Sequence, residues 1–119
     1  MSKSSFSHAV QDLDAQSFED SIRHGVVLVD FSEPWCGLCS LQRPILERVA
    51  ERVGDRARVA SVDVDEAPDL AAHFNIEALP TLVLFKDGEA VRTFVGVNSE
   101  PVLTRAILSV LEAPLSAPD

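Results

Sequence analysis

The only two cysteines of this chain are separated by two residues, in the segment Trp35-Cys36-Gly37-Leu38-Cys39. A cysteine thiolate attacks disulfide sulfurs, and a second thiol nearby can complete the exchange. At the start of a helix, unpaired N–H groups and the helix dipole lower the pKa of Cys36 below the free value of about 8.5. Cys39 follows one turn later on the same face, where it can resolve a mixed disulfide between Cys36 and a substrate. The pair therefore predicts thiol–disulfide exchange, with Cys36 as the nucleophile and Cys39 as the resolving thiol.

The resolving thiol needs a base, because a thiol in apolar surroundings resists ionisation. Asp30 is the candidate, since it is the only carboxylate in the apolar run of residues 26–31. Asp30 could equally be a carboxylate in water at the end of a strand. The residues alone leave both roles open.

A pair of cysteines at this spacing also occurs as half of a zinc site, which needs about four ligands. The remaining candidate ligands are His8, His24 and His73, which are widely scattered along the chain. We therefore predict no metal site.

The length and composition of the chain limit the alternatives. Its 119 residues suffice for one hydrophobic core, so we expect a single domain over 1–119, with a core at about 7–112 and a frayed tail at 113–119. The formal net charge of -9 argues against nucleic acid as a partner, because phosphate binding depends on Lys and Arg.

Neither a secretion signal nor a membrane span is predicted. The N-terminus lacks an apolar segment, and no stretch approaches the roughly 18 apolar residues that cross a bilayer. We therefore expect a cytoplasmic protein without a membrane partner. Most cytosolic thiols are kept reduced, so a close cysteine pair there favours a redox role over a structural disulfide.

A strand and a helix must position the cysteine pair. Residues 26–31 form a continuous apolar, β-branched run, which is typical of a central strand in a parallel sheet. After a turn, a helix is predicted to begin at Cys36 and to end at Gly54. Apolar residues recur along it at helical spacing, at Leu38, Leu41, Ile45, Val49 and Val53.

The flanking elements predict an α/β order. Before the central strand we expect a weak edge strand at residues 7–10 and a helix at 15–24, capped by Asp14. After the cysteine helix come a strand at 58–64 and a short helix at 68–74.

The last third of the chain predicts a hairpin and a helix. Strands at residues 80–85 and 90–95 flank Asp87-Gly88, a strong hairpin signal that makes the two strands antiparallel. A final helix is capped near Ser99 and extends to about Leu111. The order β-α-β followed by α-β-β-α predicts a mixed sheet flanked by helices.

Several landmarks in order, which span roughly residues 14–111, resemble the thioredoxin family. They are Val29-Asp30-Phe31, Trp35-Cys36-Gly37, Cys39, Pro44, Leu79-Pro80-Thr81, Lys86-Asp87-Gly88-Glu89 and Val95-Gly96. The resemblance implies the α/β thioredoxin fold, in which helices flank both faces of a central mixed β-sheet. It also implies a cis peptide bond between Leu79 and Pro80, beside the cysteine pair.

The same resemblance implies a shallow groove that binds an extended segment of a client protein. Its residues would be Trp35, Gly37, Leu38, Leu79, Pro80, Gly96 and Val97. Asp30 matches the buried carboxylate of the family, which is thought to move protons to and from the resolving cysteine. This match favours the catalytic role of Asp30.

The implied activity is the reduction of protein disulfides by a redox-active Cys36–Cys39 pair, without a bound cofactor. The implied partners are disulfide-containing client proteins and an NADPH-dependent flavoprotein thioredoxin reductase, and we expect a monomer. Alternatives are a more oxidising thiol oxidase or isomerase, and a non-catalytic docking or assembly module, which the two intact cysteines disfavour.

Three positions depart from the family pattern. Leu38 stands where proline is usual, Ser32 where tryptophan is usual, and Ser61 where a lysine usually neighbours the buried aspartate. Without the proline, an additional N–H lies near the Cys36 sulfur, so we predict a more oxidising pair than in a typical thioredoxin. Without the lysine, we expect the pKa of Asp30 to rise further.

Overall fold

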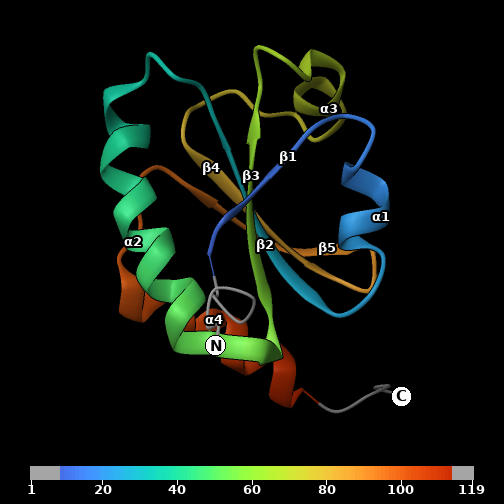
Figure 1. Ribbon diagram of the computed structural model, residues 1–119, viewed down its shortest axis with the longest axis vertical. Coiled ribbons are helices and arrows are strands. Elements are labelled where there is room, and N and C mark those ends of the chain that lie inside the picture. Colours follow the sequence, from blue (N-terminus) through green and yellow to red (C-terminus); the bar gives the residue numbers. More distant parts are fainter. Residues whose placement is uncertain (1–8, 114–119) are drawn as a thin grey trace, which may run out of the picture.

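The computed structural model describes residues 9–113, in which strands and helices alternate around one sheet (Figure 1). The strands are β1 (Gln11–Leu13), β2 (Val26–Ser32), β3 (Arg58–Asp63), β4 (Thr81–Lys86) and β5 (Glu89–Val95). The helices are α1 (Phe18–Ile22), α2 (Gly37–Val53), the 3-10 turn η2 (Gly54–Arg56), α3 (Pro68–His73) and α4 (Glu100–Glu112). Within this part of the chain, no helix has both the length and the apolar character needed to cross a membrane.

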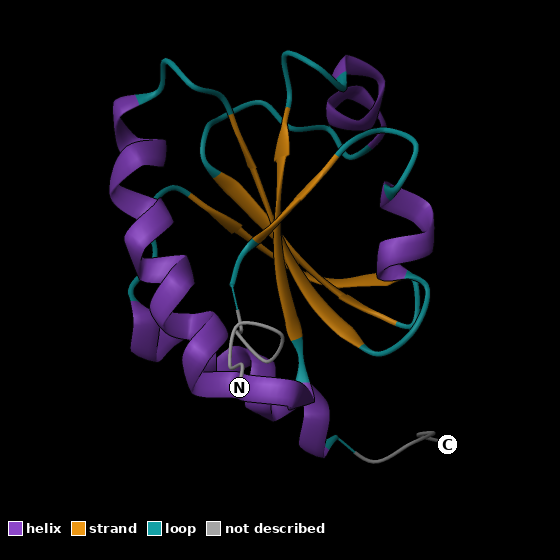
Figure 2. Ribbon diagram, in the orientation of Figure 1, coloured by secondary structure: helices purple, strands orange, loops and turns teal. Residues whose placement is uncertain are grey.

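The five strands form a mixed sheet in the order β1-β3-β2-β4-β5. β3 pairs in parallel with both β1 and β2, whereas β4 runs antiparallel to β2 and to β5. Helices cover both faces of this sheet (Figure 2). The predicted thioredoxin fold is confirmed, and β2 is its central strand.

β2 separates two hydrophobic cores, because successive side chains of a strand point to opposite faces. Val26 and Leu28 pack with residues of α2 and α4, whereas Val27 and Val29 pack with residues of α1 and with Phe85. Asp30 continues the alternation of Val26 and Leu28. It therefore faces the side of the sheet that α2 covers.

The buried face of α2 differs from the predicted one. The helix buries Cys39, Gln42, Leu46, Val49, Ala50 and Val53. Leu38 and Leu41, which the apolar spacing places on the core face, are 52% and 61% exposed. The helix packs on the core through Leu46, Val49 and Val53, and this leaves the two leucines on the outer surface.

The N-terminal predictions were wrong in their boundaries. The edge strand is β1 at Gln11–Leu13 and not residues 7–10, of which residues 7 and 8 lie outside the described part. Pairing with β3 makes this polar segment a strand. The helix predicted at residues 15–24 is only α1, because Asp14 and Ser17 form a turn before it, in which Asp14 Oδ1 accepts the N–H of Ser17 at 2.8 Å.

The remaining elements agree with the predictions. Asp87 and Gly88 adopt positive φ angles of 49° and 89° between the antiparallel strands β4 and β5, as the hairpin requires. Ser99 caps α4 by accepting the N–H of Val102. The predicted frayed tail, apart from Ala113, lies outside the described residues.

Candidate active site at the start of α2

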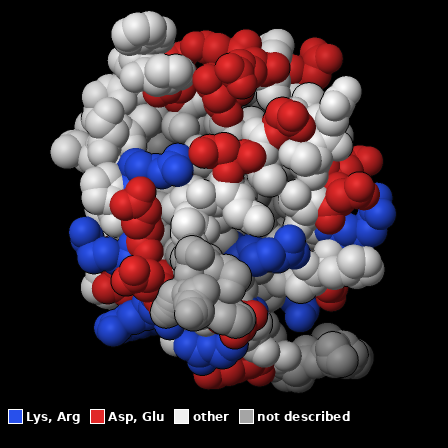
Figure 3. Space-filling model, viewed as in Figure 1, with Lys and Arg blue, Asp and Glu red and all other residues white. Residues whose placement is uncertain are grey.

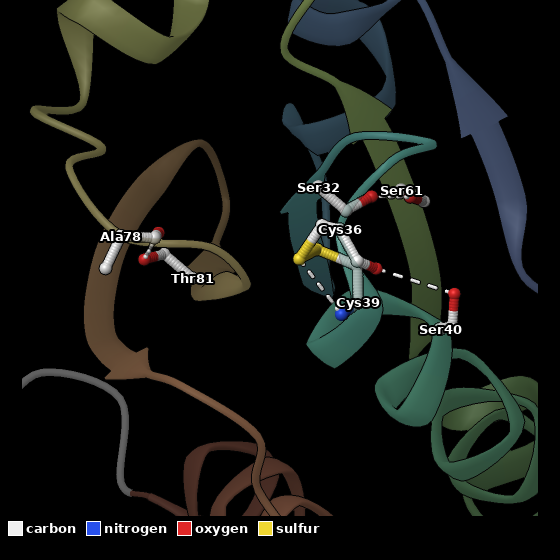
Figure 4. Close-up of a disulfide and its surroundings, with 7 residues drawn as sticks. All are labelled: Ser32, Cys36, Cys39, Ser40, Ser61, Ala78 and Thr81. Carbon is white, nitrogen blue, oxygen red and sulfur yellow. Dashed lines mark hydrogen bonds between the residues drawn. A yellow bond between two sulfur atoms is a disulfide. The ribbon is translucent and has the colours of Figure 1, made fainter.

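The two cysteines form a disulfide where β2 leads into α2 (Figure 4). Cys36 is the N-cap of α2 with an extended backbone, and its Cα lies 5.2 Å from that of Cys39. The Cys36 Sγ accepts the backbone N–H of Cys39 at 3.1 Å. The first turn of the helix therefore directs an N–H donor at the sulfur atom on which a thiolate would develop.

The two sulfurs differ in their access to solvent. Cys36 is partly exposed, whereas Cys39 is only 7% exposed and belongs to the buried face of α2. Gly37 and Leu38, which lie between them, are exposed. A client disulfide can therefore reach Cys36 more easily than Cys39.

Asp30 is buried in β2, opposite Ser61 of β3 and Leu82 of β4. It is 2% exposed, and its Oδ1 has no hydrogen-bond partner in the described structure. Burial raises the pKa of Asp30 from 3.8 to about 7, although the Arg43 guanidinium and the Ser32 hydroxyl act in the opposite direction. The carboxyl group can therefore gain and lose a proton near neutral pH.

An open cleft of about 370 Å³ brings Asp30 and Cys39 to a common space. Ser32 and Ser61 line it, with their hydroxyl oxygens 3.4 Å apart (Figure 4). Arg43 enters the cleft from α2 and forms an ion pair with Asp12 of β1 at 3.2 Å. Small polar residues thus line the cleft at positions 32 and 61, which depart from the family pattern. The cationic side chain of Arg43 reaches the cleft from α2.

The loop before β4 has the predicted cis peptide bond between Leu79 and Pro80. The Thr81 hydroxyl donates to the carbonyl of Ala78 at 2.6 Å, within this loop (Figure 4). Gly96, at the end of β5, donates its N–H to the carbonyl of Pro80 at 2.8 Å. Two of the predicted groove segments are therefore in direct contact.

Several large apolar side chains are exposed in the segments of the predicted groove and next to the cysteines along the chain. Trp35 is 87% exposed, and Leu38, Leu41 and Val97 are also exposed. Exposed large apolar side chains near a reactive group indicate a binding surface. Trp35 therefore does not serve core packing.

Two residues of α2 that lie near the site were not among the predicted ones. Arg43 follows Cys39 by four residues and Gln42 follows it by three, so helical spacing places both on the side of the resolving cysteine. Gln42 is fully buried, and Arg43 lines the cleft. The spacing from Cys39 was the signal that could have identified them.

The alternative of a metal site has no support in residues 9–113, where no group of three or more His, Cys, Asp or Glu could hold an ion. His24 precedes β2 and His73 ends α3, while His8 lies outside the described residues. The cysteines are instead bonded to each other.

Comparison with known proteins identifies the family. Residues 9–109 match the family model for thioredoxin. Thioredoxin of Bacillus subtilis is 39% identical over 92 residues, which cover 77% of this chain and 88% of that protein. Thioredoxin of Staphylococcus saprophyticus is 40% identical over 99 residues, which cover 83% and 95%.

A solved structure shows the same fold at similar identity. A mutant thioredoxin from Halobacterium salinarum superposes with a TM-score of 0.83 at 37% identity, over 91% of this chain and 96% of that one. Thioredoxins act on disulfide-containing target proteins, and this chain retains the cysteine pair as a disulfide. The chain belongs to the thioredoxin family and is a thiol–disulfide oxidoreductase with protein-disulfide reductase activity.

Proposed function

We propose that Cys36 and Cys39 reduce a client disulfide in two steps. The Cys36 thiolate attacks one client sulfur, so that a Cys36–client disulfide forms and the second client sulfur leaves as a thiolate. The Cys39 thiolate then attacks Cys36 Sγ, which releases the first client sulfur and forms the Cys36–Cys39 disulfide. Two electrons pass from the dithiol to the client. The partly exposed Cys36 at the helix start supports this order of attack.

We propose that Asp30 is the base for the second step. Asp30 and Cys39 line the same cleft, and burial brings the pKa of Asp30 to about 7, where it can accept a proton from the thiol. The variant Asp30→Asn is expected to slow release of the client, most strongly above neutral pH. Full reductase activity of this variant across the pH range would exclude Asp30 from the mechanism.

We propose that the client lies in a groove formed by Trp35, Gly37, Leu38, Leu79, Pro80, Gly96 and Val97. The exposed Trp35 and Leu38 and the hydrogen bond between Gly96 and Pro80 support this arrangement. An extended client segment can pair with backbone groups there, so that main-chain hydrogen bonds supply affinity for varied sequences.

We further propose that the chain works as a single-domain cytoplasmic monomer without a bound cofactor, recharged by an NADPH-dependent flavoprotein thioredoxin reductase. The N–H of Leu38, which proline would lack, supports a pair that is more oxidising than usual. A measurement of the Cys36–Cys39 reduction potential decides whether the protein works as a reductase or as an oxidase or isomerase.

The reduction of insulin disulfides in the presence of dithiothreitol tests the proposal. We expect the wild-type protein to accelerate insulin precipitation, and Cys36→Ser to abolish the acceleration. Cys39→Ser should accumulate a mixed disulfide with the client, because the resolving thiol is missing. Trapping by Cys36→Ser instead would reverse the assignment of the two cysteines.

A further inference from the structure

α2 carries a fully buried glutamine one turn after the resolving cysteine. Gln42 is 0% exposed, and the next buried residues of the same helix, Leu46 and Val49, are apolar. An aliphatic side chain would satisfy packing at this position. A buried amide is unfavourable unless its polar atoms are hydrogen-bonded, so the partners of Gln42 indicate its role.

Both ends of the Gln42 amide pair with the backbone of Asn98. The Gln42 Nε2 donates to the Asn98 carbonyl at 2.9 Å, and the Asn98 N–H donates to the Gln42 Oε1 at 2.8 Å. The side chain thus satisfies the donor and the acceptor of one residue that is 56 positions away. This pairing joins α2 to the connection between β5 and α4.

The hydrogen bonds continue from Asn98 to the cis-proline loop. The Asn98 Nδ2 donates to the Gly96 carbonyl at 3.0 Å, and the Gly96 N–H donates to the Pro80 carbonyl at 2.8 Å. A continuous series of contacts therefore runs from the helix that carries Cys39 through Asn98 and Gly96 to Pro80. The series therefore links α2 to two segments of the proposed client groove.

We propose that Gln42 is a positioning residue, which holds the Gly96–Asn98 segment at a fixed place relative to the disulfide and so supports client binding. The inference rests on the client groove proposed above. Fixing this segment in advance lowers the ordering cost of client binding, so that its backbone groups meet the client without rearrangement. Gln42 touches neither the client nor the sulfurs.

The variant Gln42→Leu removes both hydrogen bonds and keeps an apolar side chain in the core. We expect the KM for insulin to rise about tenfold, because the freed segment must be ordered by the client, while kcat changes less than twofold. The Cys36–Cys39 reduction potential should stay unchanged, since no contact to the sulfurs is lost. An unchanged KM in the folded variant would overturn the proposal.

A loss of stability alone must be separated from a loss of positioning. Val53→Ala is the matched control, because Val53 is buried at the far end of the same helix, away from Asn98. It should lower the free energy of unfolding and leave the KM for insulin unchanged. An equal rise of KM in Val53→Ala would show that stability, and not position, controls client affinity.

Two further measurements keep the test decisive. Hydrogen exchange of the wild-type protein should show the Asn98 amide strongly protected, and exchange as fast as in an exposed loop would overturn the inference even if Gln42→Leu failed to fold.

Trp35→Ala tests the groove itself. If Trp35→Ala raises KM and Gln42→Leu does not, the groove stands and the role of Gln42 fails. If neither raises KM, both proposals fail.

Discussion

At the scale of single residues, the proposed proton transfer from Cys39 depends on the surroundings of Asp30. The carboxyl group is buried on the side of the sheet that α2 covers, where one of its oxygens has no hydrogen-bond partner among residues 9–113, and its pKa rises to about 7 mainly because burial disfavours the charged form. Such a group destabilises the folded protein when it ionises. Its presence in a central strand therefore favours a functional over a structural role.

This buried carboxyl predicts a pH-dependent stability. The folded pKa of about 7 exceeds the ordinary value of 3.8, so the native state retains a proton that the unfolded chain releases. Protonated Asp30 therefore makes its full contribution to the free energy of unfolding below about pH 4. This contribution is lost as the pH rises through about 7, so the free energy of unfolding decreases by an amount on the order of 4 kcal/mol. Urea denaturation of the oxidised protein across this range measures it.

The variant Asp30→Asn should remove most of this dependence, because the amide does not titrate. Asp69→Asn, on the exposed surface of α3, is the matched control and should keep the wild-type slope. Identical slopes in Asp30→Asn and the wild-type protein would contradict the assignment.

Arg43 provides the second residue-scale prediction. Its guanidinium lines the cleft and opposes the rise in the pKa of Asp30. Arg43→Met should therefore raise the pKa of Asp30 further and move the decrease in stability to higher pH, whereas Arg43→Lys should preserve the wild-type midpoint. The same denaturation series gives both midpoints, and coincident midpoints for the Met and Lys variants would show that Arg43 does not act on Asp30.

At the scale of elements, the start of α2 determines the reactivity of the cysteines. Cys36 caps the helix, and the Cys39 N–H of the first turn donates to its sulfur. Leu38 lies in this turn and is exposed, so its side chain makes little packing contribution. We therefore expect its main effect on the disulfide to come from the backbone N–H that it retains.

Leu38→Pro tests this effect. The substitution removes one N–H near the Cys36 sulfur, so the thiolate is less stabilised and the reduction potential should become more negative. Leu38→Ala keeps the N–H and should retain the wild-type potential. Equilibration with glutathione measures the reduction potential of the wild-type protein and of both variants. A wild-type reduction potential at or below about -270 mV would contradict the prediction of a more oxidising pair.

At the scale of the whole molecule, the net charge of -9 is unevenly distributed. Acidic side chains gather at the end of the molecule where β3 leads toward α3 (Figure 3). Glu33, in the turn before Trp35, has its pKa raised chiefly by the charge of Asp65 and, in smaller part, by burial, by a hydrogen bond with Asp65 and by the charge of Asp63. A negative field therefore lies beside the active site.

This field should favour basic clients. A disulfide peptide flanked by lysines should react with a higher kcat/KM than the same peptide flanked by glutamates, and the difference should shrink as salt is raised toward about 1 M. The double variant Glu33→Gln/Asp65→Asn should reduce the difference in kcat/KM between the two peptides at low salt. A preference that is independent of salt would show that contacts other than long-range charge determine it.

The sequence by itself determined the reaction class and most of the architecture. The cysteine spacing, the apolar run before it and the Asp87-Gly88 turn are local patterns, because backbone geometry and hydrophobic periodicity act over a few residues. They predicted β2, α2, the hairpin and the mixed sheet. The family landmarks added the cis bond before Pro80.

Only the tertiary structure decided which side chains meet. Strand pairing with β3 made Gln11–Leu13 a strand, and the packing of α2 on the core left Leu38 and Leu41 exposed. The same packing enclosed Asp30 and buried Gln42 against Asn98. These outcomes depend on contacts between residues far apart in the chain, whose burial and pairing no local pattern encodes. The active-site pair is thus local in the sequence, whereas the burial of its proposed proton acceptor and the proposed support of its client groove come from the fold.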